Sequence, residues 1–182
     1  VFSVTDTVSK ADGGTFDASV TFAGDIIKST SGTSNFAAGV NAGNSIQSGG
    51  NYNTVVGDEA GTAITTGDQN VMVGYQAGVA VNTGTNIVAI GYQAGDAITS
   101  GENNIAIGKN ALGAEDTHDF NIAIGSNALA AQNAGVDAYN IAIGHNAGTS
   151  VTTGLYNTLI GGIAGDALTD ADRNTAVGVQ SL

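Results

Sequence analysis

Histidine and carboxylate side chains are the groups in this chain that could do acid–base or metal chemistry. The 182 residues contain two histidines, His118 and His145, and no cysteine. The histidines lie in different stretches, and neither has a nucleophile or a set of ligand residues at a fixed spacing. No phosphate-loop, dinucleotide-binding or EF-hand pattern is present. We therefore expect a protein that is not an enzyme and holds no cofactor.

The carboxylates fall largely where turns are expected, as at Asp58, Asp96 and Glu102. In turns they solvate the surface and oppose aggregation. Carboxylates gathered around a symmetry axis are a candidate Ca²⁺ site, although no calcium-loop pattern repeats along the chain. The lack of cysteine excludes zinc–thiolate sites and disulfides.

The charge balance and the lengths of the apolar runs each argue against one kind of interaction. Sixteen acidic residues against four basic ones give a net charge of -12, which opposes binding to a phosphate backbone, so we expect no nucleic-acid partner. No apolar run approaches the roughly 20 residues that cross a bilayer. We expect no membrane span.

A short repeat must position all of these groups. The string Asn-Ile-Ala-Ile-Gly occurs at 104–108, 121–125 and 140–144, with looser copies along most of the chain. The steps between its closing glycines are 18, 17, 17, 17, 17, 19, 17 and 17 residues. These glycines are Gly39, Gly57, Gly74, Gly91, Gly108, Gly125, Gly144, Gly161 and Gly178. A fixed short period predicts a solenoid, whose units bury their apolar faces by stacking.

Each repeat predicts two strands. The three residues before the glycine are apolar on both alternating faces, as at 105–107, so we expect a first strand buried on both sides. A second strand is expected around the apolar residue seven places after the glycine, with one wet face. The residues at that place are Ile46, Ile64, Val81, Ile98, Val151 and Leu168. Glycines between the strands supply the positive φ of tight corners.

A strand that is dry on both faces must meet a surface beyond its own roll. An identical chain is the simplest such surface, so we expect a symmetric homo-oligomer, specifically a homotrimer. At about 4.8 Å per stacked strand, nine turns make a rod roughly 40 Å long.

Asparagine stands four places before the glycine in eight of nine repeats. We expect a structural ladder that bonds to turn backbone and to the copies above and below; a ligand-binding column is the alternative. In the fourth repeat Ile87 takes this place and Asn86 precedes it, which predicts a local bulge. Tyr75 and Tyr92 occupy equivalent places and should stack.

The Asn-x-Ala-Ile-Gly units resemble the head repeats of trimeric autotransporter adhesins, the YadA-like head family. The Gly-Tyr-Gln-Ala-Gly strings at 74–78 and 91–95 are similar to repeats of bacteriophage tail fibres and long bacterial surface proteins. The resemblance covers about residues 35–182 and implies a left-handed parallel β-roll assembled as a trimer. The family's head repeats are shorter than 17 residues. The leader around 13–26 looks like connecting strands of phage fibres.

These features give an all-β parallel β-roll, or β-solenoid, of about nine 17-residue turns at 35–182, behind a connecting or capping β segment at 1–34. Because the sequence stops within a repeat, we expect a segment of a longer protein. The resemblance implies the shaft or receptor-facing part of a trimeric phage tail fibre on the virion, in contact with itself, other fibre or virion proteins and a host cell-surface receptor. A bacterial cell-surface adhesin is the alternative. An ice- or small-ligand-binding solenoid is a weaker one, because its threonine columns are interrupted.

Two neighbouring repeats are irregular, and recognition is usually placed on exposed loops of a rigid scaffold. The repeat after Gly125 carries two extra residues, and the one before it replaces the usual second-strand sequence with 115–120. The candidate receptor-contact residues are therefore Asp116, His118, Asp119, Val136, Asp137 and Tyr139.

Overall fold

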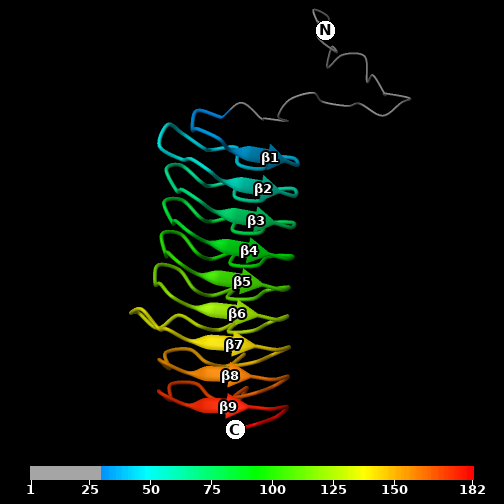
Figure 1. Ribbon diagram of the computed structural model, residues 1–182, viewed down its shortest axis with the longest axis vertical. Helices are drawn as coiled ribbons and strands as arrows, with labels where there is room; N and C mark the ends of the chain where they lie inside the picture. Colours follow the sequence, from blue (N-terminus) through cyan, green and yellow to red (C-terminus); the bar gives the residue numbers. More distant parts are fainter. Residues whose placement is uncertain (1–29) are drawn as a thin grey trace, which may run out of the picture.

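The computed structural model describes residues 30–182, which wind into a stack of short parallel strands (Figure 1). Each turn contributes one three-residue strand, and the strands pair in chain order into a single nine-stranded sheet. The strands are β1 (Phe36–Ala38), β2 (Thr54–Val56), β3 (Val71–Val73), β4 (Val88–Ile90), β5 (Ile105–Ile107), β6 (Ile122–Ile124), β7 (Ile141–Ile143), β8 (Thr158–Ile160) and β9 (Thr175–Val177). The predicted all-β solenoid is confirmed, with about eight turns between the first and last strands. Residues 30–182 contain no helix that could cross a membrane.

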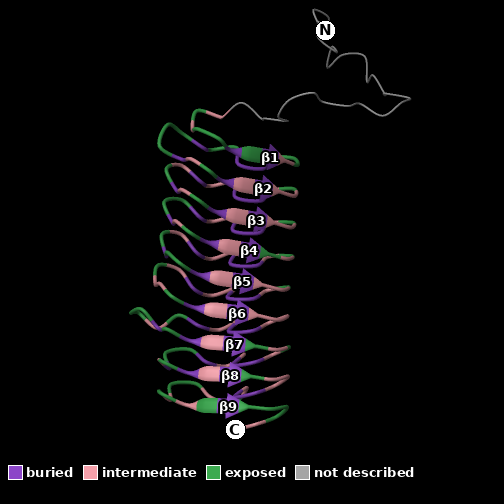
Figure 2. Cartoon of the chain, viewed as in Figure 1, coloured by how far each residue is buried: buried purple, intermediate pink, exposed green. Residues whose placement is uncertain are grey.

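The strands are buried on one face only. The middle residue of each strand points into the roll, as Ala123 does, whereas its neighbours Ile122 and Ile124 point outward and stay partly exposed. Figure 2 shows these intermediate and exposed strand residues stacked along the sheet. Alternation sends every second side chain out of a roll this narrow, so the single chain buries one side of each strand, and burial of the other side by identical chains stays a prediction.

The interior of a regular turn is filled by three small or branched side chains. In β5 and the turn before it these are Ala106 from the strand, Ala94 three places after the closing glycine, and Ile98 seven places after it, all fully buried. Such a core leaves no room for an aromatic ring, which is why the described tyrosines lie outside it. Because each turn has only three core side chains, most of its contacts are with the turns above and below.

The expected second strand does not form in residues 30–182. Ile64 is buried as predicted, but its N–H donates to Gly61 O within the same corner (3.2 Å), which is a turn bond. Non-glycine residues at positive φ also bend every full turn at two or more places, for example Glu59 (φ 61°) and Gln69 (φ 59°). These corners leave only three residues extended, so the turn has one strand.

The closing glycine is required by both conformation and space. In β8's turn Gly161 has φ 137°, and a Cβ built there would lie 2.3 Å from Gly178 O on the next turn. No L side chain fits such a position. The same close approach recurs at the closing glycines from Gly39 to Gly144, which explains the period seen in the sequence.

The asparagine ladder is confirmed as a structural device. Asn53 Nδ2 donates to Gly67 O of its own turn (2.8 Å), and its Oδ1 accepts from Asn70 N of the next (3.0 Å). The bulge predicted at Ile87 is wrong. Ile87 N bonds Asn70 Oδ1 at 2.9 Å, and β3, β4 and β5 keep a continuous register, because a buried isoleucine fills the slot without adding a residue to the strand.

The leader expected at 1–34 falls mostly outside the described residues. Residues 30–34 contain bends and no strand. The candidate contact residues all lie within the described repeats.

Candidate functional site: the double corner

All six candidate contact residues lie on two adjacent turns, on one side of the rod. We call residues 115–120 the corner, residues 133–139 the loop, and the two together the double corner. The loop lies between β6 and β7 and projects beyond the outline of the other corners (Figure 1). Val136 and Asp137 at its tip are exposed, whereas Asp116, His118 and Asp119 are half-buried.

A fully buried carboxylate holds the corner in shape. Glu115 takes the interior place that isoleucine or valine fills in regular turns. Its Oε1 accepts from His118 N (3.2 Å) and Asp116 N (3.1 Å), and lies 2.8 Å from His118 Nδ1. His118 O in turn accepts from Asn104 Nδ2 at 2.7 Å. His118 is thus a structural partner of the corner, fixed from both its ring and its backbone.

Leucine compensates for the lost apolar side chain. In a regular turn the residue four places after the closing glycine is itself glycine, and a Cβ at Gly61 would meet Ile64 Cδ1 at 2.7 Å. In the two irregular turns this place holds Leu112 and Leu129, both fully buried at positive φ (52° and 48°). That backbone conformation costs about 1–2 kcal/mol for an L residue. The irregular turns thus combine strained leucines with interior polar groups.

The loop is closed at its base by a second buried polar side chain. Gln132 is equivalent to Glu115 one turn on and is also fully buried. Its Oε1 accepts from Asn140 Nδ2 at 2.6 Å, which joins the residue before the loop to the residue after it. Asn133 N also donates to Thr152 O of the next turn (2.9 Å). The two extra residues therefore bulge outward from a fixed base.

The corner and the loop are in direct contact. Asp119 N donates to Asp137 Oδ1 at 3.1 Å, and Asp119 Oδ1 accepts from Glu102 N at 2.6 Å. Asp116 Oδ1 accepts from Thr99 Oγ1 at 2.5 Å. These carboxylates add turn-to-turn hydrogen bonds at the corners and so stabilise the stack. The remaining oxygens give the double corner an acidic surface.

Aromatic rings form a ladder beside the corner. Tyr139 stacks between Phe120 (ring centroids 4.9 Å apart) and Tyr156 (5.6 Å), and the guanidinium of Arg173 lies 5.2 Å from the Tyr156 ring centroid. The predicted Tyr75–Tyr92 stack is also confirmed, at 5.5 Å. Since neighbouring rings cover one another's faces, these columns present ring edges and hydroxyls to the exterior.

Sequence reasoning found the exposed residues and missed what holds them. The irregular spacing located the loop, but Glu115, Gln132, Leu112 and Leu129 were not singled out. A signal was present: within the repeat the two polar residues stand where Ile64, Val81 and Ile98 are apolar, and each is paired with a leucine in a glycine position.

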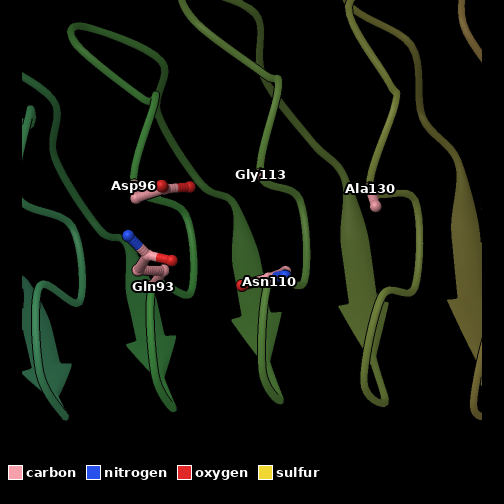
Figure 3. A pocket seen from close by; sticks show the side chains of 5 residues that line it. All are labelled: Gln93, Asp96, Asn110, Gly113 and Ala130. Carbon is pink, nitrogen blue, oxygen red and sulfur yellow. The ribbon is translucent and has the colours of Figure 1, made fainter.

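A shallow hollow of about 280 Å³ lies on a neighbouring corner (Figure 3). It is lined by Gln93, Asp96, Asn110, Gly113 and Ala130, which come from successive turns. Burial raises the pKa of the Asp96 carboxyl above its ordinary value, and a hydrogen bond from the Asp96 backbone opposes that shift. The hollow forms where small residues replace the larger ones of other turns.

Metal-binding geometry is absent from the single chain as far as it is described: within residues 30–182, no three His, Asp or Glu side chains are grouped closely enough to hold an ion. The Ca²⁺ site expected from carboxylates around a symmetry axis would need several chains, so it stays a prediction.

Comparison of the chain with protein-family models, with curated proteins and with solved structures gave no match.

Proposed function

We propose that this chain is a shaft or receptor-facing segment of a trimeric bacteriophage tail fibre that serves host attachment, with its place on the virion. The roll is left-handed in this proposal. It acts as a spacer and scaffold rather than as an enzyme. Its partners are two further copies of itself, other fibre or virion proteins, and a host cell-surface receptor.

The outward face of the sheet carries the proposal. Two straight columns of mostly β-branched side chains run along it, represented at its centre by Ile105, Ile107, Ile122 and Ile124, and each is only partly buried in the single chain. A continuous apolar strip of this kind is unusual on a monomer and is typical of an interface. Covering it with identical strips buries branched carbons against branched carbons.

A closed ring of three copies fits the asymmetry of this face. One edge is lined by the Phe120–Tyr139–Tyr156 ladder and the opposite edge by Tyr75 and Tyr92. In a three-fold ring one edge of each chain meets the other edge of its neighbour, so both edges of the face are covered. A rod assembled this way would have no free apolar face, as a fibre shaft in water requires.

The double corner is the proposed receptor contact within this fibre. Its loop tip is exposed and the candidate residues of its corner are half-buried, and buried polar groups hold both in place of regular core packing. Deleting Val136 and Asp137 restores the 17-residue period, so the assembly should persist. Adhesion of fibres to host cells should fall if the loop touches the receptor. Unchanged adhesion would place the receptor site elsewhere.

Two other functions are weighed against this one. A bacterial trimeric adhesin could use the same rod, and imaging of the native assembly separates the two: antibody against the loop should decorate fibres on virus particles, and decoration of a cell envelope instead would favour the adhesin. An ice-binding role is disfavoured by the threonine columns, since Thr65, Thr99 and Thr152 each donate to the next turn. A thermal hysteresis assay tests it.

A further inference from the structure

Two buried polar atoms are left without a protein partner, and they are chemically complementary. Among residues 30–182, Glu115 Oε2 and Gln132 Nε2 are the buried side-chain oxygen and nitrogen atoms that make no hydrogen bond. One is an acceptor and the other a donor. An unsatisfied buried polar group costs about 1–3 kcal/mol, so a pair of them on adjacent turns requires a physical explanation.

The repeat places these two residues at equivalent positions on consecutive turns. Glu115 and Gln132 stand seven places after their closing glycines on consecutive turns, and β5 and β6 are in unbroken register. Equivalent residues of stacked parallel strands are about 4.8 Å apart. A small side-chain rotation, or one water molecule, spans the remaining distance between a carboxylate oxygen and an amide nitrogen at that spacing.

The other half of each side chain is already committed. Glu115 Oε1 holds the corner through His118 Nδ1 and backbone N–H groups, and Gln132 Oε1 holds the base of the loop through Asn140 Nδ2. A bond between the free halves would therefore link the two anchoring networks. The external contact from Asp119 N to Asp137 Oδ1 joins the same two segments at the surface.

We propose that Glu115 and Gln132 form an internal clasp, with Gln132 Nε2 donating to Glu115 Oε2 directly or through one buried water, which makes the corner and the loop a single pre-shaped surface. The two side chains are positioning residues. The biological use of that surface rests on the proposed host-attachment function, whereas the clasp itself does not.

A reciprocal exchange of the two residues tests the clasp. Glu115→Gln sets donor against donor, and Gln132→Glu sets two buried carboxylates against each other. The double variant Glu115→Gln/Gln132→Glu restores a donor facing an acceptor and keeps an oxygen for His118 and for Asn140. Recovery in the double variant is not expected from two residues that merely stabilise their own turns.

Hydrogen exchange measured by mass spectrometry provides the readout, over peptides 115–121 and 131–141, with 70–77 as the internal control. Each single variant should raise exchange in the first two peptides about tenfold, as loss of one buried hydrogen bond implies, and leave the control unchanged. The double variant should return exchange to within about threefold of the parent. Equal or additive loosening in the double variant would overturn the clasp.

A second variant keeps the test decisive if Gln132→Glu does not fold. The pair Leu129→Gly/Gln132→Ile recreates the packing of a regular turn and so should fold, yet it removes the donor to Glu115 and the bond to Asn140. Exchange in peptide 115–121 should still rise about tenfold although the substituted residues lie on the next turn. No rise there would contradict the proposal. Because exchange needs no host cell, failure of the attachment function would leave this result unaffected.

Discussion

At the scale of the residue, the closing glycine shows how space and conformation together fix a position. Gly161 lies at φ 137° with Gly178 O 2.3 Å from the place of a Cβ, whereas its neighbour Gly162 is not at positive φ and has open space around it. Of these two adjacent positions, the first therefore excludes a side chain and the second accepts one.

Gly161→Ala should destabilise the roll by about 3 kcal/mol or more, because the forbidden φ and the contact with the next turn add together. The matched control Gly162→Ala should change stability by less than about 1 kcal/mol, since alanine there reduces only the freedom of the unfolded chain. Chemical denaturation of both variants checks the contrast. Equal midpoints would show that the close approach is not a constraint.

Asp96 gives a pH-dependent prediction at the same scale. Burial raises the pKa of its carboxyl in the folded state above the ordinary 3.8, so the folded state holds the proton more tightly than the unfolded chain. The charged form therefore lowers stability at neutral pH, and this penalty disappears as pH falls through the raised pKa toward 3.8. A carboxyl without the penalty of burial would show no such dependence.

Asp96→Asn should accordingly raise Tm at pH 7, with the advantage over the parent shrinking to nothing in strong acid. The exposed Asp170→Asn changes the net charge equally and serves as the control. Thermal melts from pH 7 to pH 3 follow both variants. A constant difference across that range, or an equal gain from Asp170→Asn, would contradict the assignment.

At the scale of the element, the strand face decides what a substitution disrupts. Ala123 is fully buried inside the roll, while Ile124 beside it points outward. Ala123→Asp should therefore abolish folding of the turn, because an unpaired charge enters a dry interior.

Ile124→Lys should leave the roll folded and weaken its assembly. The lysine stem can lie along the face while its charge reaches water in the monomer, but not between two apolar strips. Circular dichroism should match the parent, and size-exclusion chromatography should show smaller species. A folded variant that assembles normally would exclude this face as the interface.

The elements also show how far sequence could go. Glycine and asparagine columns predicted the solenoid and its ladder, because their roles depend on backbone geometry that repeats with the period. A second strand was predicted wrongly, because Glu59 and Gln69 give no local signal of the positive φ they adopt. The bulge at Ile87 was also wrong, since the slot accepts an isoleucine in register.

The candidate site was predictable in position and not in construction. The two extra residues after Gly125 marked the loop. Glu115 and Gln132 fit in the interior because Leu112 and Leu129, three residues earlier, fill the adjacent apolar volume. This exchange of side-chain volume between two positions of the repeat is visible only in three dimensions. Periodicity alone assigns the polar residues to a surface.

Over the whole molecule, one face of the rod keeps a strip of partly exposed apolar side chains. The corners are closed by turn-to-turn hydrogen bonds, yet the outward isoleucines of β5 to β7 remain partly exposed along the sheet. The proposal of a fibre shaft depends on that face being covered by identical copies.

Sedimentation equilibrium of the unmodified chain measures this directly. We expect a single species of three times the 17.8 kDa chain mass, persisting in high salt because the interface is apolar. A stable monomer over the micromolar range would contradict assembly through the outward face of the sheet, and a dimer would contradict its three-fold form.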